Sequence, residues 1–583
     1  MLDYIIKGGT IIDGTGGPAR TGDVGVADGV IVAVGRVTDG ARQSIDADGA
    51  LVTPGWVDVH THYDGQVSWD DTLDPSFSNG VTTVVMGNCG VGFAPVIPGE
   101  ERDLIELMEG VEDIPGSALH EGMEWGRWET FPEYLDYIAS RSYSLDVGAQ
   151  IAHGAVRSYA MGERGRANED ATAADLAAMA RIVEEAVAAG AVGFSTSRTI
   201  GHRSLWGSPV PGTFAPAEEL MAIADGMRRA GKGVFEMIPA GTVGKLQGLG
   251  GEVTTQEAEH EVMTRFSAMS GRPVTFTLVQ SPDYDPDLWR DILRRTEVAN
   301  AAGARLHPQV SSRPIGFITG LSSYHAFMRR PSYMAIAHLP IAERARAMAQ
   351  PEVRAAIMAE DDVRPEAPGS MENVYGLFKR SAAVFYPIDD PVDYEPTRDM
   401  TLGAEAAAIG IDPLEHLYDF LISREGSRFA SLSTVDIQAR MDVLREMLVH
   451  PDTVTGLSDA GAHVTLICDG SMPTTQLTHW TRDRTRGEHI PIELLVHKQS
   501  SRNATLYGMI DRGSIAVGMR ADLNVIDHER LSVSPPVAHA DLPAGGVRLM
   551  QPVRGYVATL CHGVVTRRHD TDTGARPGRL VRS

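Results

Sequence analysis

The spacing of hydrophobic residues changes along the chain. Between residues 53 and 460, short runs of β-branched and apolar residues alternate with longer stretches in which apolar residues recur every three or four positions. The short runs predict strands and the longer stretches predict amphipathic helices. The strand candidates lie at 55–60, 81–86, 146–152, 191–195, 233–237, 273–279, 304–308 and 453–457. Eight strands with interleaved helices predict an α/β fold, a TIM-like (β/α)8 barrel, whose chemistry lies at the carboxyl ends of the strands.

The helix predicted at 173–189 has clear signals at both ends. Thr172 is suited to cap its first turn, and Gly190 lies just past its last residue. Apolar residues recur at helical spacing between these two positions. Helices predicted at 217–230 and 286–302 are also each followed by glycine.

Both ends of the chain have a different texture, with short strands between glycine turns. Residues 1–52 contain candidate strands at 4–6, 10–12, 23–26 and 30–34, and similar patterns recur at 513–527 and 553–560. Neither end is long enough to bury both faces of a sheet by itself. We therefore predict one small β-sandwich built from residues 1–52 and 506–583, with the barrel over 53–505 between them.

Two insertions interrupt the barrel pattern, at 93–142 after the second strand and at 314–450 after the seventh. The second is far longer than an ordinary loop. It contains helical stretches at 341–348, 353–360 and 435–448 and a strand-like run at 383–386. We interpret both insertions as lids over a substrate pocket. The alternative is that they are solvated or oligomer-forming excursions.

Composition excludes several classes of protein. A net charge of −25 argues against nucleic acid or an anionic membrane surface as a partner. The first residues do not resemble a signal peptide, and no run of 18 apolar residues predicts a membrane span. Three cysteines in 583 residues do not make a disulfide framework, which favours a reducing cytoplasm and leaves Cys89 free to act as a thiolate.

The first predicted strand ends in two histidines, His60 and His62. Residues i and i+2 of a strand point to the same face, so both imidazoles can reach one metal ion. The alternative is a chance pair of surface histidines. The turn at 53–55 before the strand, and the residues that follow other strands, favour the metal interpretation.

Two further residues at strand ends have side chains suited to a metal. Cys89 follows the second strand, and a thiolate is a good zinc ligand. Asp459 follows the eighth strand, where a carboxylate can bind metal and transfer a proton from metal-activated water. The alternatives are an inert buried cysteine and an aspartate that caps a helix.

These motifs resemble the amidohydrolase superfamily. The resemblance rests on Pro-Gly-Trp-Val-Asp-Val-His-Thr-His at 54–62, on Gly-x-x-Ala-Asp-Leu at 518–523 and on the barrel-plus-sandwich plan. Gly-Val-Thr-Thr-Val-Val-Met-Gly-Asn-Cys-Gly at 80–90 looks like the D-aminoacylase, or N-acyl-D-amino-acid deacylase, branch. The resemblance implies zinc ligands at His60, His62, Cys89 and Asp459. It also implies deacylation by metal-activated water with Asp459 as the general acid/base.

The sequence departs from that family at two strand ends. The family has metal-binding histidines after strands 5 and 6, where this chain has Glu236 and Gln280. We therefore expect one zinc ion, held by His60, His62 and Asp459 with Cys89 as fourth ligand or close neighbour. Two metals, with Glu236 as a tentative ligand, are the alternative, and another divalent transition metal is not excluded. The fourth strand also lacks a lysine that could be carboxylated.

Substrate recognition is assigned to polar residues near other strand ends. Arg313 and Arg198 are candidates for binding a substrate carboxylate, because a guanidinium can bind it in two places at once. The alternative for each arginine is an ion pair within the protein. The other candidates for substrate binding are Gln280, His153 and Gln309. We interpret His202 as a pocket-wall or loop histidine, and His463 as a residue at the edge of the site.

Together these features predict a cytoplasmic, metal-dependent hydrolase of a linear amide that is not a peptide, such as an N-acyl amino acid. Its expected partners are the small amide substrate and further copies of the chain in a homo-oligomer. One alternative is a cyclic amide or imide hydrolase or a deaminase of the same superfamily. The other is a barrel without a metal centre that serves only in binding.

Overall fold

The computed structural model describes residues 1–281, 284–433 and 441–583. Its centre is a parallel eight-stranded sheet in which consecutive strands pair with one another. Its strands are β6 (Trp56–Asp58), β7 (Val81–Met86), β8 (Asp146–Ala152), β9 (Gly193–Ser197), β10 (Val234–Ile238), β11 (Val274–Thr277), β12 (Leu306–Val310) and β16 (Val454–Thr455). A parallel bridge between Thr61 and Ala460 links the two outer strands just past their ends. The sheet is therefore a nearly closed barrel, and the predicted fold class is confirmed.

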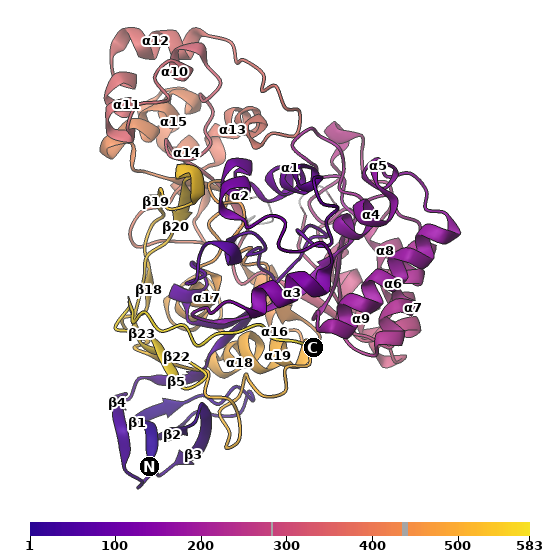
Figure 1. Cartoon of the computed structure of the whole chain (residues 1–583). Helices are drawn as coiled ribbons and strands as arrows, with labels where there is room; N and C mark the ends of the chain where they lie inside the picture. Colours follow the sequence, from indigo (N-terminus) through magenta and orange to yellow (C-terminus); the bar gives the residue numbers. More distant parts are fainter. Residues whose placement is uncertain (282–283, 434–440) are drawn as a thin grey trace.

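Helices cover the outside of the barrel. Figure 1 shows α6 (Ala173–Ala189), α7 (Ala217–Ala230), α8 (Gln256–Ser270) and α9 (Leu288–Ala301) grouped along one side of the molecule. Thr172 and Asp175 form a capping box at the start of α6, and Gly190 at its end has φ 121°, as the sequence predicted. Phe235 on β10 stacks on Phe266 of α8 with ring centroids 4.0 Å apart, which anchors a helix to the barrel wall.

A second sheet is built from both chain ends. Its strand order is β24-β23-β22-β17-β5-β1-β2-β3, with β4 (Ala41–Asp46) also paired to β1. Strand β5 (Leu51–Pro54) pairs with β17 (Leu523–Ile526), which joins the two ends of the sequence. The other strands are β1 (Leu2–Ile11), β2 (Arg20–Ala27), β3 (Val30–Gly35), β22 (Tyr556–Cys561), β23 (Val564–Arg568) and β24 (Thr571–Asp572). Both ends bury side chains in one shared core, as the sequence predicted.

The start of this sheet differs from the sequence prediction. The strands predicted at 4–6 and 10–12 are one continuous strand, β1. Its register against β2 shifts between Ile6 and Gly9, and Gly8 has φ 63°. The Gly-Gly pair that suggested a turn is therefore a β-bulge, because glycine tolerates the left-handed backbone that a bulge requires.

The first insertion supplies three helices, α1 (Glu101–Glu112), α2 (Gly116–Gly122) and α3 (Phe131–Ala139), of which α3 packs against α6. The second insertion forms a separate helical lobe, at the upper left of Figure 1, with its own hydrophobic core. Its helices are α10 (Pro331–Met334), α11 (Ile341–Met348), α12 (Pro351–Ala359), α13 (Tyr375–Arg380), α14 (Leu402–Ile409) and α15 (Pro413–Ile422). A three-stranded sheet of β13 (Gly316–Thr319), β15 (Ala430–Ser433) and β14 (Tyr386–Pro387) accompanies them.

Two elements predicted within the second insertion are a strand at 383–386 and a helix at 435–448. The strand predicted at 383–386 is instead a 3-10 turn, Ala382–Val384, followed by the two-residue strand β14. Residues 435–440 of the predicted helix 435–448 lie outside the described residues, and the described part contains α16 (Asp442–Val449). Among the helices of the described ranges, none is long and apolar enough to cross a membrane.

A hairpin arm extends from the terminal sheet toward the barrel mouth. It consists of β18 (Ser532–Val533) paired with β21 (Val553–Arg554) and of β19 (Val537–His539) paired with β20 (Arg548–Met550). At its far end the amide of Leu549 donates to the carbonyl of Val464, in the loop after β16, across 2.6 Å. The terminal domain thus reaches the carboxyl ends of the strands, where chemistry is expected.

Candidate metal centre

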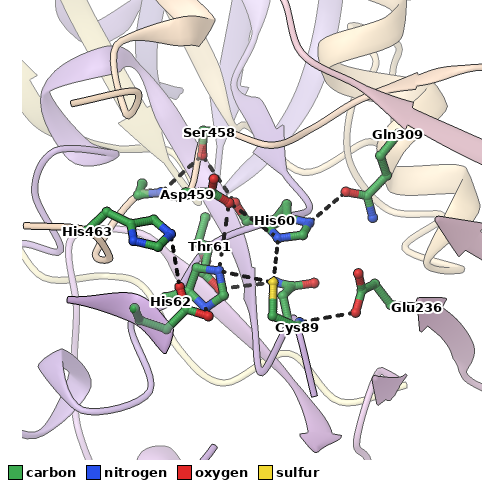
Figure 2. A network of polar contacts seen from close by, with 12 residues as sticks. His60, Thr61, His62, Cys89, Glu236, Gln309, Ser458, Asp459 and His463 are labelled. Carbon is green, nitrogen blue, oxygen red and sulfur yellow. Dashed lines mark hydrogen bonds and ion pairs between the residues drawn. The ribbon is translucent and has the colours of Figure 1, made fainter. Parts of the chain in front are cut away.

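Four side chains with metal-ligating atoms meet at the carboxyl ends of β6, β7 and β16. His60, His62 and Cys89 are buried and can place one ligand atom each within 4.8 Å of the others. Sγ of Cys89 lies 3.4 Å from Nε2 of His60 and 3.8 Å from Nε2 of His62. Oδ1 of Asp459 lies 3.3 and 3.7 Å from the same two nitrogens. Figure 2 shows the four side chains converging on one point.

The backbone around these residues adopts conformations that are rare outside glycine. Cys89 has φ 57° and lies between Gly87 (φ 82°) and Gly90 (φ 70°), while Asp459 has φ 47°. Left-handed backbone at non-glycine residues costs free energy and persists where the surrounding structure enforces it, often at functional sites. The sharp turns after β7 and β16 bring the thiol and the carboxylate back toward the two histidines.

Hydrogen bonds hold the ligand residues in place. Oε1 of Gln309, on β12, lies 2.8 Å from Nδ1 of His60. Because an amide oxygen only accepts, this contact puts the His60 proton on Nδ1 and leaves the Nε2 lone pair directed at the other ligands. Oγ of Ser458 donates to Oδ2 of Asp58 across 2.5 Å, which ties the last barrel strand to the first.

The pKa shifts of the site residues show which charges the site stabilises. Burial lowers the pKa of His60 to about 4. At His62 burial also disfavours the cation, but Glu112 and Asp459 outweigh it and raise the pKa to about 9. Burial would raise the pKa of Asp459, but His62 and His60 hold it well below its usual range. The cluster therefore stabilises one positive charge among anionic groups.

The residues present fit a zinc ion. Two imidazoles, one thiolate and one carboxylate are donors that zinc binds in proteins, and four of them suit its tetrahedral preference. Burial raises the pKa of the Cys89 thiol, but a bound metal ion deprotonates a coordinating thiol. Nδ1 of His62 is buried and makes no hydrogen bond to any described residue.

The two residues that replace the family's histidines differ in their surroundings. Oε2 of Glu236 accepts a hydrogen bond from the backbone amide of Cys89 at 3.2 Å, and Oε1 is buried without a hydrogen bond to any described residue. Nε2 of Gln280 donates to the carbonyl of Pro286 at 2.8 Å. Glu236 thus supports the cysteine loop beside the ligand cluster, and its role as a metal ligand stays a prediction.

The two candidate arginines form ion pairs within the protein. Nε of Arg198 lies 3.2 Å from Oε1 of Glu259, and Nη1 of Arg313 lies 2.8 Å from Oδ1 of Asp469. The Arg313 guanidinium also stacks over the ring of Tyr394 at 3.9 Å. The structure therefore shows the interaction that was the alternative for each arginine. A role for either in binding a substrate carboxylate remains untested.

The candidate histidine His153 also has internal partners. Its Nε2 lies 2.8 Å from Oε1 of Glu219, and its Nδ1 lies 2.8 Å from Oγ1 of Thr196. His202, on the loop after β9, lies 2.9 Å from Oγ of Ser197. Thr196 and Ser197, which contact these two histidines, both come from the carboxyl end of β9, so both histidines lie at that end of the barrel.

Sequence reasoning missed one acidic residue at the centre. Glu112, the last residue of α1 in the first insertion, lies 3.5 Å from Nδ1 of His62 and 3.4 Å from Nε2 of His463. It stands in an ordinary helical stretch, so no local signal marks it. The sequence also did not predict the hairpin arm, whose residues Arg548, Leu549 and Gln551 line a pocket together with Asp459.

A parallel barrel with two histidines after its first strand, a cysteine after its second and an aspartate after its last defines a class of metal-site barrels. A model described as "Amidohydrolase family" matches residues 43–567. The chain belongs to the amidohydrolase family.

Deacylases and an uncharacterized protein are among the relatives of the chain. The chain is 36% identical to a D-aminoacylase of Alcaligenes xylosoxydans xylosoxydans over 196 residues, which are 33% of this chain and 37% of that protein. It is 36% identical to an N-acyl-D-aspartate deacylase of the same organism, over 40% of this chain and 42% of the relative. Both matches span less than half of the relative's length. An uncharacterized protein of Mycobacterium tuberculosis is 27% identical over 94% of this chain and 88% of its own.

Solved structures show the same fold over the whole chain. A crystal structure of D-aminoacylase aligns with a TM-score of 0.64 and 22% identity and covers all of both chains. An N-acyl-D-glutamate deacylase from Bordetella bronchiseptica, complexed with zinc and a phosphonate inhibitor, aligns with a TM-score of 0.63 and 23% identity, also over all of both chains. The predicted resemblance to the D-aminoacylase branch is confirmed.

Proposed function

We propose that this protein is a zinc-dependent hydrolase that cleaves the amide bond of an N-acyl-D-amino acid. The observation that carries the proposal is the convergence of His60, His62, Cys89 and Asp459 within a few ångströms of one another. Family membership supports hydrolysis as the reaction class. The names of the D-aminoacylase and N-acyl-D-aspartate deacylase relatives suggest the substrate class.

The proposed cofactor is one zinc ion held by Nε2 of His60, Nε2 of His62, Sγ of Cys89 and a carboxylate oxygen of Asp459. When bound, zinc supplies Lewis acidity that polarises a carbonyl and lowers the pKa of water. We favour a single ion because the two histidines that bind the tighter zinc in the family are replaced by Glu236 and Gln280. The amide nitrogen of Gln280 donates to the Pro286 carbonyl, and a glutamine amide is not among the usual zinc ligands of proteins.

Asp459 is the proposed general acid/base. Its carboxylate lies beside both histidines and lines the adjacent pocket, so it can reach both the ligand cluster and a bound substrate. The neighbouring His62 and His60 keep it ionised, which is the state that accepts a proton from the attacking water. The same carboxyl group then donates that proton to the departing amine nitrogen, and the carboxylate is regenerated.

The remaining residues of the site position these groups. Gln309 fixes the ring of His60, and Glu236 accepts from the amide of Cys89, so the ligands stay in place while the substrate enters. Preorganisation of this kind lowers the cost of reaching the reactive arrangement. Leu549 and Gln551 of the hairpin arm form the wall opposite Asp459, and this wall contributes to the choice of substrate.

The test is a hydrolysis screen with purified, zinc-loaded protein over N-acetyl amino acids of both hands, with the released amine as readout. We expect hydrolysis of D-enantiomers, loss of activity with a chelator, and about one zinc per chain. His62→Ala is the matched control, because it removes one ligand and is expected to empty the site. Activity that is indifferent to chelators in protein free of transition metal would overturn the proposal. Hydrolysis of cyclic imides but not of acyl amino acids would favour the cyclic-amide alternative.

A further inference from the structure

The carboxylate of Glu112 reaches the candidate metal centre from outside the barrel strands. Glu112 ends α1, in the insertion after the second strand, and its side chain is almost completely buried. Oε1 lies 3.5 Å from Nδ1 of His62, and Oε2 lies 3.4 Å from Nε2 of His463. One carboxylate therefore bridges a proposed zinc ligand and a second histidine.

The contact with His62 involves two atoms that have no other partner. Nδ1 of His62 and Oε1 of Glu112 are both buried, and neither makes a hydrogen bond to another described residue. The opposite ring nitrogen, Nε2, faces Cys89 and Asp459. A buried polar atom without a partner is costly, so an acceptor at this place favours the His62 tautomer that carries its proton on Nδ1.

We propose that Glu112 is a positioning residue that holds the His62 ring and keeps the Nε2 lone pair available to zinc. A ligand histidine commonly donates its other N–H to a carboxylate, which fixes the ring and raises its basicity as a ligand. In this chain Gln309 does this for His60 from within the barrel. Glu112 does it for His62 from the first insertion, so that insertion completes the metal centre as well as covering the barrel.

The end of α1 is anchored firmly enough for this role. The amide of His463 donates to the Glu112 carbonyl. The next residue, Asp113, has φ 55° and accepts from the hydroxyl of Tyr324 at 2.5 Å and from the amides of Thr465 and Leu466 at 3.2 Å each. Tyr324 belongs to the second insertion, and Thr465 and Leu466 to the loop that follows Asp459. These contacts place Glu112 without any help from a metal ion.

The inference rests on the proposed zinc site but not on the proposed substrate, so its test measures zinc affinity. Zinc dissociation constants are measured by chelator competition for the full-length wild type, Glu112→Gln and Glu112→Ala, together with the melting temperature of each zinc-free protein. We expect affinity to fall in that order, by about 10- to 100-fold for Glu112→Ala. The isosteric Glu112→Gln should lose affinity while the zinc-free protein melts near the wild-type temperature.

Glu109→Gln is the matched control, because Glu109 lies on the same helix and its carboxylate faces the backbone of Gly116 instead of the metal centre. It should bind zinc within about twofold of wild type. If Glu112→Ala fails to fold, Glu112→Leu, which is of similar size and has no acceptor for Nδ1 of His62, takes its place. Wild-type affinity in a folded variant without the acceptor, or a loss no larger than that of Glu109→Gln, would overturn the inference. Zinc binding by the wild type without amide hydrolysis would overturn only the proposed function.

Discussion

The backbone amide of Cys89 and the carboxylate of Glu236 are joined by a 3.2 Å hydrogen bond between Oε2 and the amide nitrogen. Glu236 stands at the strand end where the family has a histidine that binds the tighter zinc. The bond commits one of its two oxygens to the loop that carries the thiol. The acid thus stabilises the left-handed backbone of Cys89.

The first prediction concerns the number of metal ions. Glu236→Gln should retain about one zinc per chain, because Gln can still accept from the Cys89 amide and the four proposed ligands are unchanged. Inductively coupled plasma mass spectrometry of wild type and variant, dialysed against the same buffer, measures the ratio. Two ions per wild-type chain that fall to one in the variant would instead assign Glu236 to a second metal.

The second prediction concerns Asp459. Asp459→Asn should lower kcat by about 10²- to 10⁴-fold, because an amide cannot carry the proton from water to the departing amine. Zinc should remain bound at saturating metal, since His60, His62 and Cys89 are retained. Steady-state kinetics and the zinc content of the same preparation provide the readouts. Near-normal turnover in a folded, zinc-loaded variant would remove Asp459 from the mechanism.

The third prediction concerns the contact between the barrel and the terminal sheet. The hydroxyl of Tyr556, on β22, donates to the Asn79 carbonyl at 2.7 Å and accepts from Nε1 of Trp56, on β6, at 3.2 Å. Tyr556→Phe leaves both groups buried without this partner, so the free energy of unfolding should fall by about 1 to 3 kcal/mol. Denaturant unfolding measures it. Tyr159→Phe, which removes an exposed hydroxyl, should change it by less than about 0.5 kcal/mol.

The fourth prediction concerns acid stability. Burial and then the charge of Arg344 lower the pKa of His325, in the helical lobe, to about 3. The folded protein keeps this histidine neutral, whereas the unfolded chain binds a proton near pH 6.5. Above pH 6.5 this histidine is neutral in both states, and its protonation does not lower the free energy of unfolding. As pH falls from 6.5 toward 3, only the unfolded chain binds the proton, and the free energy of unfolding falls by about 1.4 kcal/mol per pH unit.

Thermal unfolding between pH 8 and 5 tests this linkage. In the wild type, the amide of Phe327 donates to Nδ1 of His325. The variant His325→Asn keeps an acceptor for this amide, but its side chain does not titrate between pH 8 and 5. The variant is expected to be less stable at pH 8, because Asn is smaller, and to lose less stability on acidification. Equal slopes for the two proteins would contradict the assignment.

Much of the fold could be predicted because it depends on local patterns. The helix at 173–189 and its caps follow from hydrophobic spacing and from Thr172 and Gly190, which act within one turn of the chain. The eight strands follow from short apolar runs, although β9 begins two residues later than predicted. The sequence around Gly8 predicts a turn where the structure has a β-bulge, because a Gly-Gly pair permits both conformations. The pairing of β1 with β2 decides between them.

The site could be predicted only in part. His60, His62, Cys89 and Asp459 each follow a strand, so the barrel topology itself brings them to one end. Arg198 and Arg313 could not be placed, because their partners Glu259 and Asp469 are distant in sequence or lie on other elements. The residues of the hairpin arm had no signal, since their position near Asp459 depends on contacts across the whole molecule.

The sequence by itself determined the barrel, the terminal sheet and the four side chains with metal-ligating atoms. Strands and helices follow from the local spacing of apolar residues, and residues that follow parallel barrel strands all lie at the same end of the barrel. Only the tertiary structure decided what surrounds them. Glu112 meets His62 because an inserted helix ends against the loop after the last strand. Such contacts form between surfaces that are far apart along the chain, and no spacing along the sequence records them.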